Sequence, residues 1–252
     1  MKLSGVIIAK NTEDLIRGVL DSLKFCDEVI LIDNDSEDNT PQIAKDRGAK
    51  VFKISTKDFS VLRNRGAQEA LGEWILYVDC DERVSMELRQ NIIKSISLKD
   101  GPSAYKVLRK NYYFGTPWPK VEKMERLFKK ENFRGWYGKI HESPKFDGKA
   151  GLLQGYLLHF THGDLTYMLN KTIEWSSIEA EARFNANHPK VKSWRIFRVM
   201  LTSFLSSFIR DRGIKAGSVG ILESVYQSFS TFITYAKLWE LQEKNKKIKE
   251  KN

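Results

Sequence analysis

Asp79-Cys80-Asp81-Glu82 places three carboxylates directly behind the apolar run Trp74–Val78. A strand that ends in two aspartates one residue apart can aim both side chains into one cleft. Paired carboxylates repel each other unless positive charge lies between them. A divalent cation, bound through carboxylates and substrate phosphates, supplies that charge. The alternative is a surface turn whose acids cap a helix over Ser85–Ile96.

A second acidic turn repeats this arrangement earlier in the chain. The apolar run Val29–Ile32 leads into a turn with four acids, Asp33-Asn34-Asp35-Ser36-Glu37-Asp38. Between the two acidic turns lies Arg63-Asn64-Arg65-Gly66, on a segment with helical character. Two strand ends and one basic helix therefore carry the polar residues that could do chemistry.

The elements that position these residues alternate between strand and helix. Such alternation implies parallel strands joined by right-handed crossovers, and sheets of this kind place their chemistry beyond the carboxyl ends of the strands. After residue 104 the pattern loosens, and the last ninety residues look helical. The expected strands are Leu3–Ala9, Val29–Ile32, Lys50–Ile54, Trp74–Val78, Ala104–Leu108 and Leu152–Phe160. The expected helices of the front half follow Asn11 or Thr12, run from Thr40 to Gly48, and span Ser60–Leu71 and Ser85–Ile96.

The order and spacing of four motifs resemble the family 2 glycosyltransferases of the GT-A fold. The resemblance implies an α/β fold with a Rossmann-like, mostly parallel central sheet and a helical C-terminal extension. It implies a nucleotide-sugar half over 1–100, an acceptor half over 101–165 and helices over 166–252. The motifs are Val6-Ile7-Ile8-Ala9-Lys10-Asn11, Leu31–Asp38, Arg63-Asn64-Arg65-Gly66 and Gly72–Glu82.

Later motifs resemble a narrower branch, the lipopolysaccharide inner-core β-glucosyltransferases. These are Gly138-Lys139-Ile140-His141-Glu142, Leu158-His159-Phe160 and Tyr235–Glu240. Lys215-Ala216-Gly217 departs from the branch, where an acidic residue is expected before the glycine. The branch implies glucose from UDP-glucose as the transferred sugar and a lipid-linked or phosphorylated glycan as the acceptor.

The resemblance assigns the donor site residue by residue. Asp33 would hold the uracil or its ribose, and Asp79 would contact the ribose or the sugar. Arg63 would lie near the nucleotide, although a helix residue could equally form a surface ion pair. The remaining residues of the expected nucleotide-sugar site are Ala9, Lys10, Asn11, Glu13, Asp35 and Cys80.

The resemblance also implies a cation and a base. Asp81 and His159 would hold Mg²⁺ or Mn²⁺, which neutralises the departing diphosphate. Inverting transfer needs a carboxylate that takes the proton of the acceptor hydroxyl. Glu142 is the expected base, with His141 as its orienter or rival, and Asp147 is the less favoured alternative.

The charge distribution fits an anionic partner behind the donor site. The chain carries a net charge of +10, yet residues 1–102 hold 15 basic and 18 acidic side chains. The rest is basic, which suits a phosphorylated acceptor or an anionic membrane. Apolar stripes at helical spacing near arginines fit helices lying on such a membrane, and core packing explains the stripes equally well. The stripes are Trp194, Phe197, Leu201, Phe204, Leu205 and Phe208, then Leu222, Val225, Tyr226, Phe229, Ile233 and Ala236.

Two rival functions fit parts of the sequence. A sugar-phosphate nucleotidyltransferase shares the α/β sheet and metal-binding aspartates, but it needs a Gly-rich phosphate loop where this chain has Lys10–Glu13. A basic nucleic-acid or lipid-binding module fits the charge, although no nucleic-acid motif is present and no nucleic-acid partner is expected. With two cysteines, no signal-peptide pattern and no stretch of ~18 uncharged apolar residues, we expect a cytoplasmic protein, on the inner membrane if its helices touch lipid.

Overall fold

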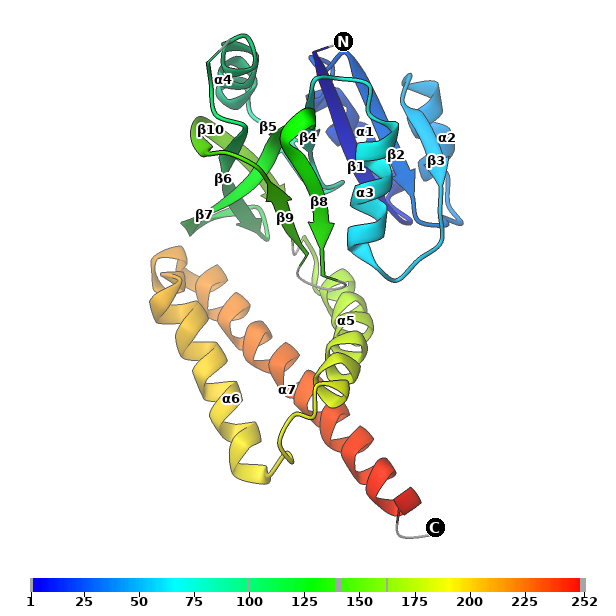
Figure 1. The fold of residues 1–252 in the computed structure, drawn as a ribbon. Coiled ribbons are helices and arrows are strands. Elements are labelled where there is room, and N and C mark those ends of the chain that lie inside the picture. The colour runs from blue at the N-terminus through cyan, green and yellow to red at the C-terminus, as the bar shows by residue number, and fades with distance from the viewer. Residues whose placement is uncertain (1, 99, 139–141, 162, 250–252) are drawn as a thin grey trace. The chain divides into compact units, whose positions relative to one another are not determined.

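The computed structural model describes residues 2–98, 100–138, 142–161 and 163–249 (Figure 1). The chain divides into two compact units. We call residues 1–110 and 121–159 the sheet unit, and residues 111–120 and 160–252 the helical unit. The acidic turns of the sequence analysis lie in the sheet unit, and the apolar stripes lie in the helical unit.

A single eight-stranded sheet organises the sheet unit, in the order β3-β2-β1-β4-β7-β6-β10-β5. Strands β3, β2, β1 and β4 pair in parallel, whereas β7 pairs antiparallel with β4 and β5 antiparallel with β10. A small antiparallel ribbon joins β8 to β9. The strands are β1 (Leu3–Ala9), β2 (Glu28–Asp33), β3 (Lys50–Lys53), β4 (Trp74–Tyr77), β5 (Glu82–Val84), β6 (Ala104–Tyr113), β7 (Thr116–Lys129), β8 (Phe133–Tyr137), β9 (Ser143–Phe146) and β10 (Ala150–Phe160).

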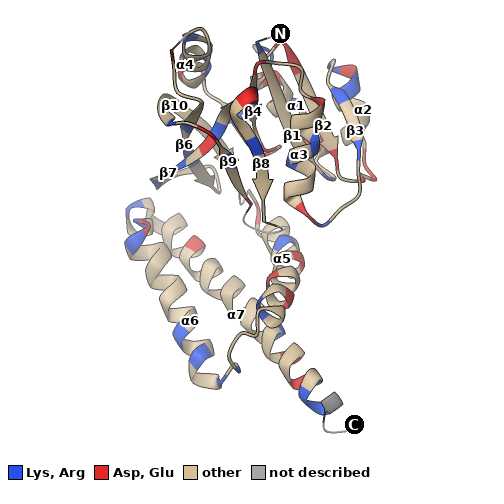
Figure 2. Ribbon diagram, in the orientation of Figure 1, with Lys and Arg blue, Asp and Glu red and all other residues tan. Residues whose placement is uncertain are grey.

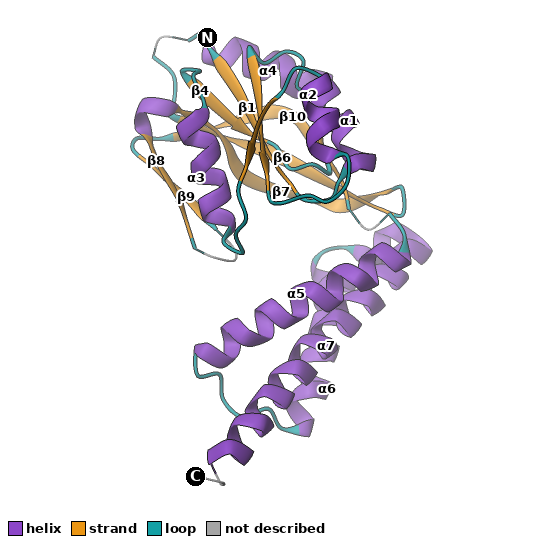
Figure 3. Ribbon diagram, turned by 90° about the vertical axis from the view of Figure 1, so that its right-hand side faces the viewer, coloured by secondary structure: helices purple, strands orange, loops and turns teal. Residues whose placement is uncertain are grey.

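Two hydrophobic cores cover the two faces of the parallel strands. Alternate strand residues point to opposite faces, so Ile7 of β1 joins one core while Val6 and Ile8 join the other. The first core lies under α1 (Glu13–Ser22), α2 (Thr40–Asp46) and α4 (Met86–Ile96), and the second lies under α3 (Phe59–Glu69) and the β8–β9 ribbon (Figure 3). Strands β1, β2 and β4 are buried on both faces, which explains their apolar runs, whereas the edge strand β3 is partly exposed.

The stretch Tyr112–Tyr137, where the sequence pattern loosens, contains the 14-residue strand β7. Hydropathy does not reveal this strand because its charged residues pair within the sheet unit. Arg109 of β6 binds Glu122 of β7 at 2.9 Å, and Lys106 binds Glu125 at 3.4 Å. The charges that make the segment look irregular are thus the ones that stabilise it as a strand.

The loop that follows β2 binds the start of α1, which follows β1. Thr12 is the N-cap residue of α1, as expected, but its side chain makes no capping hydrogen bond. The amide of Thr12 instead donates to Thr40 Oγ1 at 2.7 Å, and the amide of Glu13 donates to Asp38 Oδ2 at 3.0 Å. The acidic turn therefore satisfies the free amides at the start of α1.

The helical unit consists mainly of three α-helices. They are α5 (Leu165–Asn185), α6 (Ser193–Leu205) and α7 (Gly217–Lys249). A π-helical turn, η2 (Ser206–Arg210), and a 3₁₀ turn, η3 (Gly213–Ala216), connect α6 to α7. No helix among the described residues is long and apolar enough to cross a membrane.

Gly66 lets α3 lie directly on β1, and substitution there tests this contact. A Cβ atom at position 66 would lie 2.3 Å from Val6 Cγ1, and Val6 is buried. We expect Gly66→Ala to lower the free energy of unfolding by about 1–3 kcal/mol in urea titrations, as for other overpacked sites. Gly163→Ala is the control, since its Cβ has no atom within 4 Å. Equal stability of both variants would contradict this packing.

Candidate active site

A network of buried charges gathers where β4 ends. Asp79 follows β4 by two residues, and Arg63 comes from α3. The antiparallel pairing of β4 with β7 runs through Leu76 and Leu127, so Arg126 is the next residue along β7. The two arginines are 7% and 5% exposed, which places their guanidinium groups inside the protein.

The two arginines hold the Asp79 carboxylate from both sides. Arg63 Nη2 lies 3.0 Å from Asp79 Oδ1, and Arg126 Nη2 lies 2.7 Å from Asp79 Oδ2. Burial favours the neutral acid and would raise the pKa of Asp79, but the charges of Arg126 and Arg63 outweigh burial and hold that pKa well below its ordinary value. Asp79 is therefore a carboxylate at neutral pH.

Arg63 also binds Glu142, the expected base. Its Nε lies 2.7 Å from Glu142 Oε1, and its guanidinium carbon lies 4.8 Å from the centre of the Trp136 ring. Residues 63 and 142 are far apart in the chain, so this ion pair brings the donor motif and the later motif into one site. Because the Arg63 side chain is buried, its ion pairs are not the surface ion pair that the sequence left open.

The neighbour of Arg63 explains the rest of that motif. Asn64 Nδ2 donates to the carbonyl of Trp136 at 2.9 Å, and Asn64 Oδ1 accepts from the amide of Trp136 at 2.8 Å. This two-way contact fixes β8 against α3. Tyr77 Oη donates to the carbonyl of Arg63 at 3.0 Å and fixes α3 against β4. The Arg63 side chain is thus positioned by bonds on both sides of its helix.

Glu82 is fully buried beside Asp79. Its Oε2 accepts from the amide of Asp79 at 2.9 Å, and its Oε1 lies 3.2 Å from Arg126 Nη2 and 3.4 Å from Arg109 Nη1. Burial raises the pKa of Glu82, and Arg126 opposes that rise. Glu82 therefore fixes the turn after Asp79 from within the protein.

Asp81 points to a different partner from Asp79. The pairing of β5 with β10 sets His159 opposite Glu82, and His159 Nε2 lies 3.3 Å from Asp81 Oδ2. Both side chains are about one-seventh exposed. The two aspartates thus have different partners. Arg63 and Arg126 balance the charge of Asp79, whereas Asp81 faces the imidazole of His159.

Asp81 and His159 are the residues that could hold a divalent cation. No group of three or more His, Cys, Asp or Glu side chains among the described residues could hold a metal by itself. Two protein ligands are nevertheless compatible with Mg²⁺ or Mn²⁺, because such ions keep several waters and are completed by substrate phosphates. The donor set fits a cation that binds together with a diphosphate.

Ala9 and Asp33 lie side by side at the ends of β1 and β2. They are register partners, and Asp33 is buried with its Oδ1 accepting from the amide of Ser36 at 3.2 Å. Asn11 and Asp35 have φ angles of +51° and +62°, so each turn bends sharply after its strand. Both strand ends therefore present main-chain atoms at the same edge of the sheet.

The other expected donor residues serve this turn or the core. Lys10 is exposed, and the carboxylate of Glu13 accepts from both nitrogens of Asn39 at 3.1 Å. Asp35 binds Lys53 at 2.7 Å, and Lys53 lowers the pKa of Asp35. Cys80 is half-buried and packs against the first core.

His141 lies outside the described residues. Asp147 is more than half exposed and pairs with Arg134, 13 residues away on the β8–β9 ribbon. Of the two candidate bases, Glu142 is therefore the one that pairs with Arg63.

Arg126 and Arg109 are functional candidates that the sequence analysis did not identify. The sequence does not point to these arginines, because its hydropathy pattern does not predict strand β7 next to β4. The Met124-Glu125-Arg126-Leu127 segment has no regular alternation of charged and apolar residues, and only its pairing with Trp74–Tyr77 places a cation beside Asp79.

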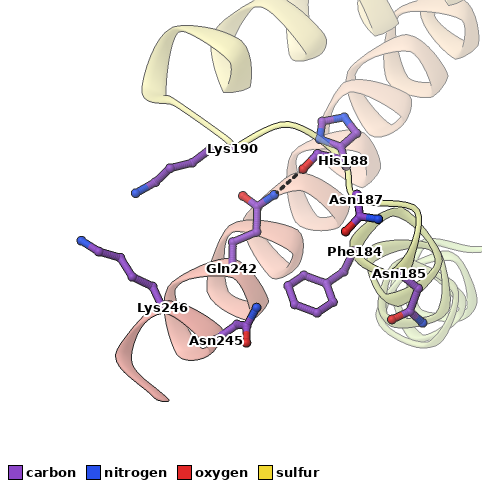
Figure 4. A pocket seen from close by; sticks show the side chains of 8 residues that line it. All are labelled: Phe184, Asn185, Asn187, His188, Lys190, Gln242, Asn245 and Lys246. Carbon is purple, nitrogen blue, oxygen red and sulfur yellow. Dashed lines mark hydrogen bonds between the residues drawn. The ribbon is translucent and has the colours of Figure 1, made fainter. Parts of the chain in front are cut away.

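A separate hollow lies in the helical unit. It has a volume of about 530 Å³ and lies between the end of α5, the loop before α6 and the end of α7. Gln242 reaches across it and donates to the carbonyl of His188 at 2.9 Å (Figure 4). Its walls are amide and basic side chains together with the ring of Phe184, and none of the expected site residues lies there.

Comparison with known proteins identifies the class. A family model described as glycosyl transferase family 2 matches residues 4–168. The chain is 30% identical over 264 residues to an uncharacterised glycosyltransferase of Rickettsia typhi, covering 98% of this chain and 90% of that one. It is 24% identical to the lipopolysaccharide core biosynthesis glycosyltransferase LpsC of Rhizobium meliloti, covering 95% and 93%. The crystal structure of S. aureus TarS shares the fold, with a TM-score of 0.50 at 17% identity over 95% of this chain and 55% of that one.

The fold and these comparisons define an enzyme that transfers a glycosyl group. The chain belongs to glycosyl transferase family 2. The prediction of a GT-A fold with a helical C-terminal extension is confirmed, and so is the similarity to lipopolysaccharide core transferases. The family favours this class over the nucleotidyltransferase and the binding module.

Replacing Arg126, the arginine that binds both Asp79 and Glu82, tests how much the buried charge network stabilises the fold. Loss of one partner of a buried ion pair leaves an uncompensated charge and costs about 3–5 kcal/mol. We expect Arg126→Met to lower the free energy of unfolding by about that amount in urea titrations. Lys123→Met, at an exposed position on the same strand, is the control. A loss no larger than the control's would show that the network does not stabilise the fold.

The low pKa of Asp79 predicts a specific pH dependence. A group whose pKa is lowered on folding stabilises the protein above its unfolded pKa, and this stabilisation is lost as the pH falls. The difference in unfolding free energy between the wild type and Asp79→Asn should therefore narrow below about pH 4. Urea titrations from pH 7 to pH 3 measure it, and a constant difference would contradict the assignment.

Proposed function

We propose that this enzyme transfers a hexose, with inversion, from a nucleotide sugar to a hydroxyl group of a phosphorylated or lipid-linked glycan. UDP-glucose is the proposed donor, and the lipopolysaccharide core is the proposed acceptor class. The observation that carries the proposal is the bridge from Asp79 through Arg63 to Glu142. It links the residue proposed for the donor to the residue proposed for the base.

The donor lies, in this proposal, across the ends of β1, β2 and β4. The nucleoside contacts Asp33 and the main chain of Ala9–Asn11, and the sugar lies near Asp79. Asp79 remains a carboxylate because of its arginines, so it can accept hydrogen bonds from hydroxyl groups of the ribose or the sugar. Its orientation is fixed before substrate arrives, which favours catalysis by positioning.

Glu142 acts as the base in the proposed reaction. Its carboxylate takes the proton of the acceptor hydroxyl, and the acceptor oxygen bonds to the anomeric carbon. The bond from that carbon to the diphosphate oxygen breaks, and the nucleoside diphosphate leaves with the bonding electrons. Attack on the face opposite the leaving group inverts the configuration. Arg63 orients the Glu142 carboxylate through its Nε contact.

Asp81 and His159 would hold Mg²⁺ or Mn²⁺ beside the diphosphate. A cation there stabilises the negative charge that develops on the leaving group. The imidazole of His159 would bind the ion through a ring nitrogen.

The acceptor class rests on similarity and charge. LpsC, by its name, acts in lipopolysaccharide core biosynthesis. Residues 103–149 of this chain hold 12 basic and 5 acidic side chains, which would attract a phosphorylated glycan. The proposed glycan type therefore comes from the similarity of this chain to LpsC.

Replacing Glu142 separates the chemical step from donor binding. We expect Glu142→Gln to lower kcat by about 10²–10⁴, the usual range for a lost general base, while UDP binds as in the wild type. Release of UDP from UDP-glucose with a core-oligosaccharide acceptor gives the rate, and calorimetry gives the affinity. Asp147→Asn is the matched control at an exposed carboxylate. Unchanged kcat in Glu142→Gln would place the base elsewhere.

Replacing Asp81 tests the cation independently of turnover. Titration of Mn²⁺ in the presence of UDP, followed by the paramagnetic resonance of free Mn²⁺, should show a bound ion in the wild type. The bound ion should be lost in Asp81→Ala and His159→Ala and retained in Asp147→Asn. Retention of Mn²⁺ by Asp81→Ala would exclude Asp81 as a ligand.

A further inference from the structure

Within the helical unit, α6, η2, η3 and the start of α7 form a segment that we call the hairpin, and it exposes large apolar residues. On α6, Trp194, Phe197, Leu201 and Leu205 recur at helical spacing and are 41–73% exposed. The exposed apolar surface continues over the turns and the start of α7. The further members are Ile209, Ile214, Ile221, Leu222, Val225 and Phe229. The stripes seen in the sequence therefore do not pack as a core at these positions.

Small and polar residues occupy the contact between α6 and α7 instead. Ser224 Oγ donates to Ser207 Oγ at 3.0 Å, and Ser203 Oγ donates to the carbonyl of Gln227 at 3.1 Å. Thr231 Oγ1 donates to Ser203 Oγ at 3.0 Å. Both Ser207 and Ser224 are buried. Val199 of α6 is also buried, but much of the contact is made by hydroxyl groups, while the large apolar residues named above face outward. This is unusual for a helix pair that folds by burying apolar residues.

The connection between the helices has the same character. A Cβ atom at Gly220 would lie 1.8 Å from the carbonyl oxygen of Gly213, so the two backbones are in direct contact. Interfaces rich in Gly, Ser and Thr, with hydrogen bonds across helices, are typical of helices in lipid, where apolar side chains gain nothing by turning inward. This arrangement therefore points to an apolar environment around the hairpin.

Charge indicates which apolar environment this is. Residues 191–236 contain six basic and two acidic side chains. Of the acids, Glu223 is 1% exposed and Asp211 pairs with Lys120 at 2.6 Å. Figure 2 shows the basic residues near the two ends of α6, with uncharged residues between them. Arginines beside an apolar stripe complement an anionic lipid surface.

Trp194 marks one edge of the stripe. The guanidinium carbons of Arg195 and Arg198 lie 5.6 Å and 5.4 Å from the centre of its ring. Aromatic rings with a polar rim and long basic side chains are the groups that lie at the level of lipid headgroups. Since no described helix can span a membrane, the hairpin would lie along the surface rather than cross it.

We propose that the hairpin of α6, η2, η3 and the start of α7 is a membrane-docking element that inserts its apolar face among the headgroups of anionic lipids. The inference concerns an interaction surface and goes beyond the proposed transfer reaction. It depends on glycosyl transfer only in that a lipid-linked acceptor would be met at the same surface.

Vesicle binding tests the proposal without any sugar substrate. Sedimentation with phosphatidylcholine vesicles that contain phosphatidylglycerol should retain the wild-type protein, and vesicles of phosphatidylcholine alone should retain much less. Phe197→Asp removes a buried ring from the lipid and should weaken binding by about tenfold or more. Arg198→Gln should weaken binding by about fivefold, and added salt should weaken binding of the wild type.

Met86→Asp is the matched control, because Met86 is 76% exposed on α4 in the sheet unit. It should bind vesicles like the wild type. Equal binding of Phe197→Asp and wild type, with unchanged circular dichroism, would overturn the proposal. A lipid-free dimer that Phe197→Asp converts to a monomer, with no vesicle binding by either protein, would assign the face to a second copy of the chain instead. Loss of turnover with intact vesicle binding would contradict only the transfer reaction.

Discussion

The site depends on how one buried carboxylate is neutralised. Asp79 follows the central strand β4 by two residues, and burial alone would favour its protonated form. Arg63 and Arg126, at 3.0 Å and 2.7 Å, keep it charged. Because Arg63 comes from the helix on one face of the sheet and Arg126 from the antiparallel half of the same sheet, the ion pairs join the parallel and antiparallel halves of the sheet unit at the candidate site. Arg63 also binds Glu142, so this one guanidinium group positions both the proposed donor-binding carboxylate and the proposed base.

This network also separates the two aspartates of the acidic turn. If both carboxylates faced the same cation, each would need it for charge balance. Here Asp79 is balanced by the protein itself, and Asp81 faces His159 at 3.3 Å. A cation brought in with the donor would then need only Asp81 and His159 from the chain. The charge of Asp79 is thus balanced by Arg63 and Arg126 without a ligand.

The parallel half of the fold could be predicted from sequence because β1, β2 and β4 are buried on both faces and each appears as an apolar run. Leu3–Ala9 is β1 with the expected bounds, and Asp33 ends β2 as expected. The antiparallel half could not, since β7 owes its stability to charges such as Arg126 and Glu122 whose partners lie on other strands. The Arg63–Glu142 pair was equally hidden, because the two residues are 79 positions apart. For the C-terminal helices, the stripes were visible in the sequence, but only the structure shows that serines share the contact between α6, η2 and α7 while much of the stripes is exposed.

The anomalous signal of Mn²⁺ in crystals grown with UDP tests the account of the site most directly. We expect one Mn²⁺ peak next to Asp81 and His159, with Asp79 still bonded to Arg63 and Arg126. A peak ligated by Asp79, with its arginines displaced, would contradict the account, and so would a bound nucleotide with no peak beside Asp81.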